Sequence, residues 1–180
     1  MNFIIYDLEA TCWLGRPPHG VNEVIEIGAI KMNPYGEEIG RFSKFIKPKV
    51  NPVLSHFCKQ LTSIQQEDID HASDFPTVVE SFKNWIDVYE DEYLLCSWGG
   101  FDEVLLKNDC DLHNLEADWL EHRINVKKQY HAYKRSEKER GLKASVQAEG
   151  FDFDGAHHRA ISDAENLAKI FARYIDIWQF

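Results

Sequence analysis

The stretch of residues 3–11 constrains this chain most, because four apolar residues run directly into two acids. An apolar run that ends in Asp7-Leu8-Glu9 predicts a short buried strand with an acidic carboxyl end. Side chains alternate along a strand, so Asp7 and Glu9 should point to the same side. Neighbouring carboxylates repel each other, and a hard divalent cation such as Mg²⁺ or Mn²⁺ between them removes that cost. The alternative is a strand end that opens into solvent, where acids are common.

Size and composition predict one globular domain that covers residues 1–180. Of the 180 residues, 44% are hydrophobic and 28% charged, and no apolar run approaches the ~20 residues of a membrane span. The first strand begins at the N-terminus, which leaves no room for a signal peptide. The cysteines show neither a CxxC pair nor close spacing, which is typical of a reducing compartment and predicts a cytoplasmic protein. They are Cys12, Cys58, Cys96 and Cys110.

The net charge of −10 argues mildly against nucleic acid as a partner, but the charge is unevenly distributed. Residues 123–143 contain eight basic and two acidic side chains, so this window is strongly positive. A local basic surface attracts phosphates, and a solvated helix face is an equally good explanation. The basic residues are Arg123, Lys127, Lys128, Lys134, Arg135, Lys138, Arg140 and Lys143.

Hydrophobic periodicity divides the first half of the chain into strands and then helices. Residues 23–32 and 38–47 predict two strands that the turn at 33–36 joins into an antiparallel hairpin, and Pro48 ends the second strand. Residues 63–68 predict one short helix within an irregular segment. Pro76 opens a longer helix with one apolar face. This face comprises Val78, Val79, Phe82, Trp85, Ile86 and Tyr89.

The second half of the chain continues this alternation. The predicted elements are strands at 93–98 and 124–126, and helices after 100, at 127–135, at 141–149 and from about 161 onward. Gly99 and Gly100 close the fourth strand and allow a sharp exit. Ser162 and Glu165 have the spacing of a capping box at the start of the last helix. A hairpin followed by alternating strands and helices predicts a mixed α/β sheet with helices on its faces.

Acids that follow later elements are further site candidates, because such sheets bind ligands at the carboxyl ends of their strands. Asp102 follows the fourth strand and would meet Asp7 if the two strands are parallel neighbours. Considered alone, Asp102 is better explained as an acid favoured by a helix N-terminus. His158 and Asp163 are about 140° out of register on one regular helix. Both can face one site if His158 lies on the incoming loop and Asp163 in the first turn; the alternative is an exposed loop histidine.

Three separated motifs resemble, in their order, those of the DEDDh 3′→5′ exonucleases of the ribonuclease-H-like fold. They are Asp7-x-Glu9, Asp102 and His158-x-Ala160-x-x-Asp163. Residues 7–13, 22–28, 60–64, 97–102 and 157–159 resemble the Eri-1-like branch, which includes the histone-message 3′-end exonuclease of animals and the KapD-like bacterial proteins. The resemblance covers essentially the whole chain, although Phe101 stands where that branch usually has Trp and no separate RNA-binding domain precedes. It implies a mixed five-stranded sheet in the order 3-2-1-4-5, with strand two antiparallel.

The resemblance implies hydrolysis of phosphodiester bonds with two divalent ions, Mg²⁺ or Mn²⁺, that clamp the attacking and leaving oxygens. Asp7 would bridge both ions. Glu9 and Asp163 would complete the ligands of the first ion, and Asp102 would hold the second. His158 would take the proton from the attacking water, since an imidazole with a pKa of about 6.5 suits neutral pH.

Residues beside the acids are implied as contacts of the substrate. The contacts to the terminal nucleotide would be Leu8, Ala10 and Thr11. Phe101 would stack on the final base, although packing in the core is the commoner role for such a residue. The phosphate candidates are Arg159, Lys127 and Lys128. Glu26, in the middle of the second strand, is expected to have a structural role.

The implied partner is a single-stranded nucleic acid with a free 3′-hydroxyl, RNA in preference to DNA, degraded to nucleoside 5′-monophosphates by a monomer without membrane contact. One alternative is a DNA 3′–5′ exonuclease of the proofreading or repair type, which a 2′-hydroxyl contact would separate from an RNA enzyme. Another is a non-catalytic nucleic-acid-binding regulator on the same fold. The complete set of four acids and one histidine argues against that last alternative.

Overall fold

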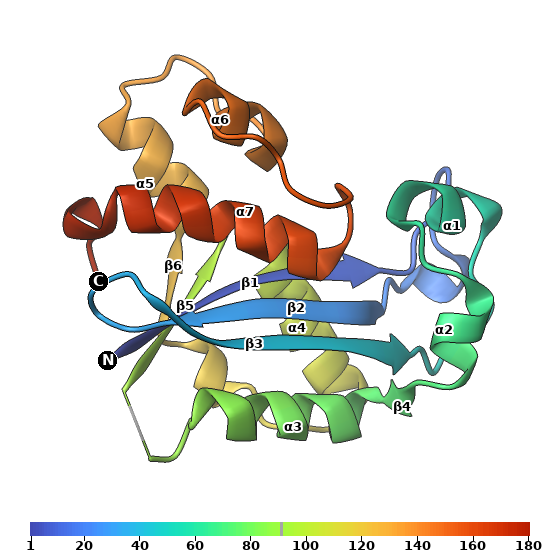
Figure 1. The fold of residues 1–180 in the computed structure, drawn as a ribbon. Coiled ribbons are helices and arrows are strands. Elements are labelled where there is room, and N and C mark those ends of the chain that lie inside the picture. The colour runs from blue at the N-terminus through green and yellow to red at the C-terminus, as the bar shows by residue number, and fades with distance from the viewer. Residues whose placement is uncertain (91) are drawn as a thin grey trace.

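A computed structural model describes residues 1–90 and 92–180 (Figure 1). Within these residues six strands form one sheet in the order β4-β3-β2-β1-β5-β6. The strands are β1 (Asn2–Ala10), β2 (Val24–Met32), β3 (Glu38–Lys47), β4 (Ser73–Asp74), β5 (Tyr93–Ser97) and β6 (Arg123–Asn125). β2 runs antiparallel to both β1 and β3, whereas β1, β5 and β6 are parallel.

The predicted order 3-2-1-4-5 is confirmed for β3-β2-β1-β5-β6, and so is the antiparallel hairpin of β2 and β3. The structure adds β4, which pairs in parallel with the carboxyl end of β3. A strand of two residues carries too little alternation to be predicted from its own sequence.

Helices cover both faces of the sheet and its acidic end. They are α1 (His56–Thr62), α2 (Gln66–Asp70), α3 (Phe75–Ile86), α4 (Phe101–Leu112), α5 (Val126–Tyr133), α6 (Leu142–Ala148) and α7 (Ala160–Arg173), with short 3₁₀ turns at Pro18–Gly20, Asp118–Leu120 and Ile175–Ile177. In the part of the chain that is described, no helix has the length and apolar character needed to cross a membrane.

Two helix predictions are wrong in detail. The single helix at 63–68 is in fact two helices, because Ser63 adopts a left-handed conformation (φ 62°) that ends α1 before α2 begins. Tyr89 does not belong to the apolar face of α3, because Asp87 ends that helix in the same conformation (φ 68°). Tyr89 is consequently 74% exposed.

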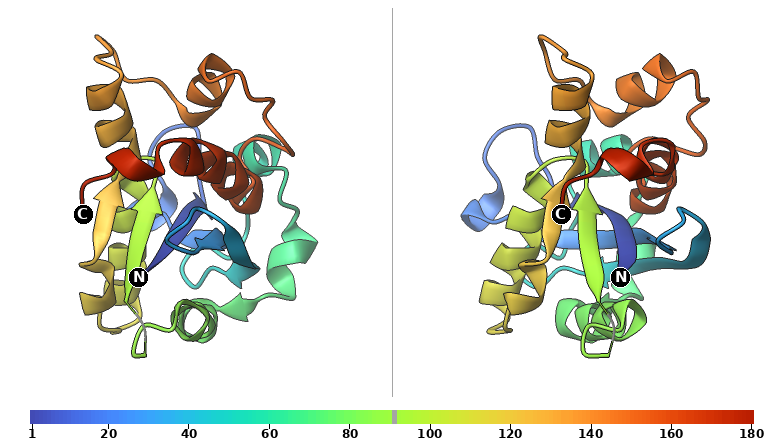
Figure 2. Two further views of the ribbon diagram at one scale, coloured as in Figure 1. Left: turned by 60° about the vertical axis from the view of Figure 1, so that its left-hand side comes forward. Right: turned by 90° about the vertical axis from the view of Figure 1, so that its left-hand side faces the viewer.

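Helices lie on both sides of the sheet (Figure 2), and the alternation of side chains along β1 divides the core between these two layers. Ile4, Tyr6 and Leu8 pack with α3 and α4 on one face of the sheet. Phe3 and Ile5 pack with α5, α6 and α7 on the other face. The same period of two places the acids at positions 7 and 9 on the face that α7 covers. Residues at the end of β1 therefore meet residues at the start of α7.

Close approach between β2 and α7 depends on Gly28. A Cβ atom at this position would lie 2.1 Å from the backbone nitrogen of Ile161 and 2.2 Å from the carbonyl carbon of Ala160. Only a residue without a side chain allows the first turn of α7 to lie directly on the strand. Because Asp163 belongs to that turn, Gly28 determines how close this acid comes to β1.

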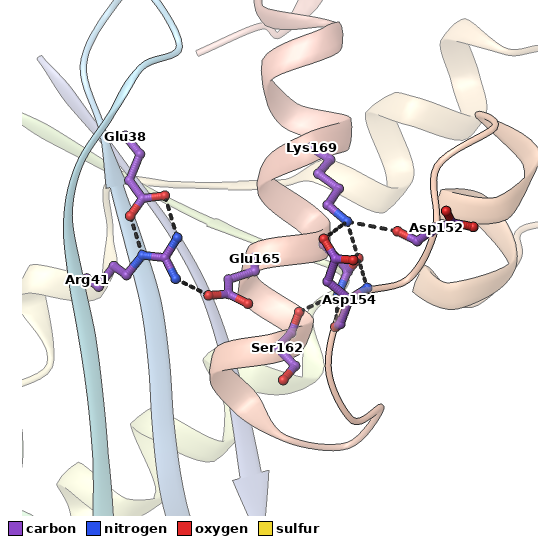
Figure 3. Close-up of polar contacts among 8 residues, drawn as sticks. Glu38, Arg41, Asp152, Asp154, Ser162, Glu165 and Lys169 are labelled. Atoms are coloured by element: carbon purple, nitrogen blue, oxygen red, sulfur yellow. Dashed lines mark hydrogen bonds and ion pairs between the residues drawn. The ribbon is translucent and has the colours of Figure 1, made fainter.

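The start of α7 differs from the predicted capping box. The helix begins at Ala160, so Ser162 lies inside it, and no side-chain cap forms at its N-terminus. Instead the amide of Ala160 donates a hydrogen bond to the carboxylate of Glu26 on β2 (3.0 Å). Glu165 turns outward and pairs with Arg41 of β3 (Figure 3). A carboxylate from β2 thus accepts the hydrogen bond of the first amide of α7, a role that the local sequence was expected to fill.

The loop between α6 and α7 is fastened to α7 by side chains (Figure 3). Lys169 donates hydrogen bonds to the carbonyl of Asp152 (2.8 Å) and to the carboxylate of Asp154 (2.7 Å). Asn166 donates from its amide to the carbonyl of Asp154 (2.8 Å) and accepts from the backbone amide of the same residue (3.0 Å). These bonds position the last residues of the loop, 157–159, before the helix starts.

Candidate active site

A cavity of about 410 Å³ opens where the carboxyl end of β1 meets α4, α6 and the loop before α7. A larger cavity of about 550 Å³ lies elsewhere, beside Tyr93 and Trp119, and none of the predicted site residues lines it. Most of the predicted site residues line the cavity at β1. They are Asp7, Leu8, Glu9, Ala10, Thr11, Phe101, Asp102, His158 and Asp163.

Three carboxylates converge inside this cavity. Oxygen atoms of Asp7, Glu9 and Asp163 lie within 4.8 Å of one another. Strand alternation brings Asp7 and Glu9 to one side of β1, and the close packing of α7 against β2 brings Asp163 beside them. Asp102, in the first turn of α4, is tied to β1 by a hydrogen bond from the backbone of Leu8. All four acids named from the sequence therefore come together.

Burial and mutual repulsion raise the pKa of every acid in this cluster. Burial, followed by the charge of Asp163, raises the pKa of Glu9 to about 9. Burial also raises the pKa of Asp102 to about 7 and that of Asp163 to about 6. The pKa of Asp7 lies well above its ordinary value, because of burial and the charges of its acidic neighbours. Without a cation, the cluster therefore retains protons near neutral pH.

The acid cluster has the donor chemistry of a divalent-metal site. Oδ1 of Asp163 is buried and has no hydrogen-bond partner among the described residues. Its other oxygen accepts from the backbone amide of His158 (2.8 Å). A buried carboxylate oxygen without a partner is costly, and a cation removes that cost while favouring the ionised form of each acid. An all-oxygen set of ligands suits a hard divalent ion.

His158 lies on the loop before α7, and Asp163 lies in the first turn of that helix, as their spacing required. His158 has a left-handed backbone (φ 66°). Burial and the positive charge of Lys143 lower the pKa of its imidazole. The ring is therefore neutral at physiological pH and can accept a proton.

Two predicted nucleotide contacts differ from expectation in their surroundings. Phe101 is 66% exposed at the mouth of the cavity, so its commoner role in the core does not apply. It is the first residue of α4. Thr11 is fully buried, and its hydroxyl oxygen accepts a hydrogen bond from the amide of Glu23 (2.9 Å). The Thr11 hydroxyl thus already takes part in a hydrogen bond within the protein.

The predicted phosphate contacts are not among the residues that line the cavity. The guanidinium of Arg159 forms two hydrogen bonds to Glu26 (3.1 and 3.0 Å) and lies over the ring of Phe45, which indicates a structural role for both charged residues. Lys127 pairs with Glu139 (3.4 Å), and Lys128 is exposed on α5. Among the basic residues of segment 123–143, Lys143 is the one whose charge lowers the pKa of His158.

Several residues that line the cavity were not named as site residues from the sequence. They are Cys12, Asn22, Leu61, Trp98, Leu105, Leu142 and His157. Five of these residues could have been named from the sequence, because they belong to the five segments that carry the family resemblance. Leu105 and Leu142 lie outside those segments. The other two reach the cavity only through the packing of α4 and α6.

Comparison with known proteins identifies relatives along almost the whole chain. The Exonuclease family, RNase_T, matches residues 4–171. The protein named 3′-5′ exoribonuclease 1 of Homo sapiens is 33% identical over an alignment of 179 positions, which covers 95% of this chain and 51% of that protein. The chain spans about half the length of this protein and of its rat and mouse counterparts.

Two solved structures share the fold and about a third of the sequence. The nuclease domain of 3′hExo, described as a DEDDh family member bound to rAMP, superposes with a TM-score of 0.90 at 31% identity and covers 97% of this chain and 92% of that chain. A 3′-exonuclease solved with a histone mRNA stem-loop gives 0.90 at 30% identity, over 97% of this chain and 81% of that chain. The predicted family is confirmed: the chain belongs to the Exonuclease family, in its DEDDh, Eri-1-like branch.

Proposed function

We propose that this protein is a metal-dependent 3′–5′ exonuclease, which removes nucleotides from the 3′ end of single-stranded RNA and releases nucleoside 5′-monophosphates. One observation carries the proposal: Asp7, Glu9 and Asp163 converge within 4.8 Å, and Asp102 and His158 line the same cavity. A surface that only binds nucleic acid gains nothing from buried acids that repel one another and the phosphates. This arrangement therefore favours an enzyme over a non-catalytic regulator.

The four acids would hold two divalent ions, Mg²⁺ or Mn²⁺. When bound, such ions polarise the scissile phosphate and stabilise the charge that develops on the attacking and leaving oxygens. Asp7 would contribute to the ligands of both ions, since its carboxylate lies close to those of Glu9 and Asp163 and lines the same cavity as Asp102. Glu9 and Asp163 would complete one set of ligands, and Asp102 the other.

His158 would act as the general base. Its neutral imidazole accepts the proton of the attacking water, and its lowered pKa keeps the ring in this form at neutral pH. The hydrogen bond from its backbone amide to Asp163 holds the backbone of His158 beside the acid cluster. His158 and Asp163 are thus positioned by one short segment at the start of α7.

The cavity would receive the terminal nucleotide of the substrate. Its volume of about 410 Å³ falls in the ordinary range for small-ligand sites. Phe101 offers an exposed aromatic face on which a base of any sequence can stack. Leu8, Ala10 and Thr11 would line the sugar side. RNA is the preferred substrate in this proposal because the human relative is named an exoribonuclease and the 3′hExo domain is bound to rAMP.

The proposal includes one catalytic domain over residues 1–180 that acts as a cytoplasmic monomer. One continuous sheet through the described residues supports the single domain. The four cysteines are unpaired, which suits a reducing compartment.

Incubation with 5′-labelled single-stranded RNA tests the proposal directly. With Mg²⁺ or Mn²⁺, the label should move into a ladder that shortens from the 3′ end, and EDTA should stop it. A DNA oligonucleotide of the same sequence should be degraded more slowly. An Asp7→Asn variant should be inactive. Internal cuts, or wild-type turnover in the variant, would contradict the assignment.

A further inference from the structure

A second group of potential metal ligands shares Asp163 with the acid cluster. Donor atoms of His157, His158 and Asp163 lie within 4.8 Å of one another. The two imidazole centroids are 3.9 Å apart, and Nε2 of His157 lies 3.8 Å from Oδ1 of Asp163. These residues provide two nitrogen donors and one carboxylate at the rim of the cavity.

The gap between His157 and Asp163 is of a size that a metal ion fills. At 3.8 Å it is too long for a hydrogen bond. Two ligand atoms that bind the same Zn²⁺ ion, each at about 2.1 Å from it, are separated from each other by a similar distance. Asp163 is only 4% exposed, and its Oδ1 has no hydrogen-bond partner among the described residues. The buried carboxylate thus directs an unpaired oxygen toward the imidazole.

Neighbouring groups hold the two imidazoles in place. The ring of Phe153 contacts the ring of His157 edge-on, with centroids 5.3 Å apart at 89°. The amide of His158 donates to Oδ2 of Asp163, which leaves Oδ1 available. The positive charge of Lys143 acts on both rings and weakens the affinity of the site for any cation.

We propose that His157, His158 and Asp163 form a second metal site, which shares Asp163 with the acid cluster, for a borderline divalent transition metal of the Zn²⁺ class. Imidazole nitrogen favours Zn²⁺, whereas Mg²⁺ remains with all-oxygen ligands. Filling the site occupies a nitrogen lone pair of His158 and an oxygen of Asp163 at once. Zn²⁺ would consequently inhibit the enzyme in the presence of its activating ion. The inhibition rests on the proposed function, whereas binding of the metal does not.

Calorimetric titration of the metal-free protein with Zn²⁺ tests the site without any nuclease assay. A His157→Gln variant should bind Zn²⁺ more weakly by at least roughly tenfold, since even loss of a residue that only supports a ligand costs this much. His56→Gln, a change at an exposed histidine outside the cavity, is the matched control and should bind as wild type. Asp7→Asn, which disables the acid cluster, should retain Zn²⁺ binding.

Equal Zn²⁺ affinity in wild type and His157→Gln would overturn the proposal. So would parallel loss of binding in Asp7→Asn, because the ion would then occupy the acid cluster. A nitrogen-15 NMR titration of the wild type covers the case in which a variant misfolds. Among the eight histidines, the imidazole signals of His157 and His158 should shift first. Unchanged signals for this pair would likewise reject the site.

Kinetics with saturating Mg²⁺ then test the consequence for activity. With inhibition expressed relative to each protein's own rate without Zn²⁺, His157→Gln should need at least roughly tenfold more Zn²⁺ for half-inhibition than wild type. Equal inhibition of both proteins would show that Zn²⁺ does not act through this site. If no preparation cleaves RNA, the proposed function fails, while the calorimetric result still decides the metal site.

Discussion

His158 is suited to act as a base by its neutral ring and by its fixed position at the start of α7. His158→Ala should lower the rate of the chemical step by about 10²–10⁴-fold, because it removes the proton acceptor and none of the four acids. Single-turnover kinetics should show this loss, and calorimetry should show Mg²⁺ binding close to that of wild type. Wild-type turnover in this variant would exclude His158 as the base.

The pH profile provides a second check on the same residue. A lowered pKa means that the imidazole becomes neutral below its ordinary value of about 6.5. With saturating Mg²⁺, the rate should rise with pH along a limb whose midpoint lies below that value, and His158→Ala should lack this limb.

The acid cluster should make the metal-free protein less stable as pH rises. The folded protein binds protons more tightly than the unfolded chain, since the pKa values of Glu9, Asp102 and Asp163 are raised to about 9, 7 and 6. Stability is therefore lost as pH rises from about 4 to about 9. Asp7→Asn removes one of the repelling charges. In EDTA at alkaline pH it should gain about 2 kcal/mol, or roughly 4–8 °C in Tm.

Thermal melts across this pH range, with wild type and Asp7→Asn side by side, measure the effect. Equal melting temperatures at alkaline pH would mean that the carboxylates do not repel one another as their positions indicate. At acidic pH the two proteins should converge, because the cluster is then protonated.

Residues related by local spacing were predictable, and residues related only by the fold were not. The period of two along β1 sufficed to place Asp7 and Glu9 on one side of the strand. The ion pair of Arg159 could not be predicted, because its partner Glu26 lies on β2, far away in the sequence. The exposure of Phe101 likewise depends on which elements pack around the start of α4, and no local pattern records that.

At the level of elements, the close packing of α7 against β2 determines the position of Asp163 in the site. Gly28→Ala would place a Cβ atom 2.1 Å from the backbone of α7, so the helix must move away. We expect a loss of about 3 kcal/mol in stability and of at least about 10²-fold in activity, because Asp163 moves with the helix. Denaturant unfolding and RNA cleavage measure the two effects.

Gly40→Ala is the matched control on β3. The nearest contact of its added Cβ would be an ordinary 3.5 Å, so stability and activity should change little. Similar losses in both variants would show that the close approach at position 28 has no special role.

Glu26 fastens the first residues of α7 to the sheet. Glu26→Ala leaves Arg159 and the amide of Ala160 without their acceptor. We expect a loss of about 3 kcal/mol, the lower end for a buried pair, because the side chain of Arg159 is 29% exposed. Glu165→Ala, which breaks the more exposed pair with Arg41, should cost less than about 1 kcal/mol in the same denaturant series. Equal losses would contradict the anchoring role of Glu26.

Strands and long helices were predictable because each carries its own periodicity. The break between α1 and α2 was missed because Ser63 gives no glycine signal for a left-handed residue. The cap of α7 was misassigned because the acceptor for its first amide comes from β2 and not from the preceding residues. The strands and helices could thus be predicted from the local sequence, whereas the points where helices begin and end depend on the tertiary structure.

For the whole molecule, metal ions should add stability as well as activity. Ions that bind only the folded state at 100 times their Kd stabilise it by about 2.7 kcal/mol. Saturating Mg²⁺ should therefore raise the Tm of wild type by roughly 5–10 °C over EDTA, and should not raise that of Asp7→Asn. Differential scanning calorimetry checks this, and an equal rise in both proteins would place the ions outside the cluster.

The acids that meet in the cavity come from residues 7 and 163, almost at opposite ends of the sequence. A chain emerging from the ribosome carries the first pair of acids long before the last helix exists. The acid cluster therefore cannot assemble before the segment that contains α7 has been made, so a chain synthesised only as far as β1 and α4 holds an incomplete set of metal ligands.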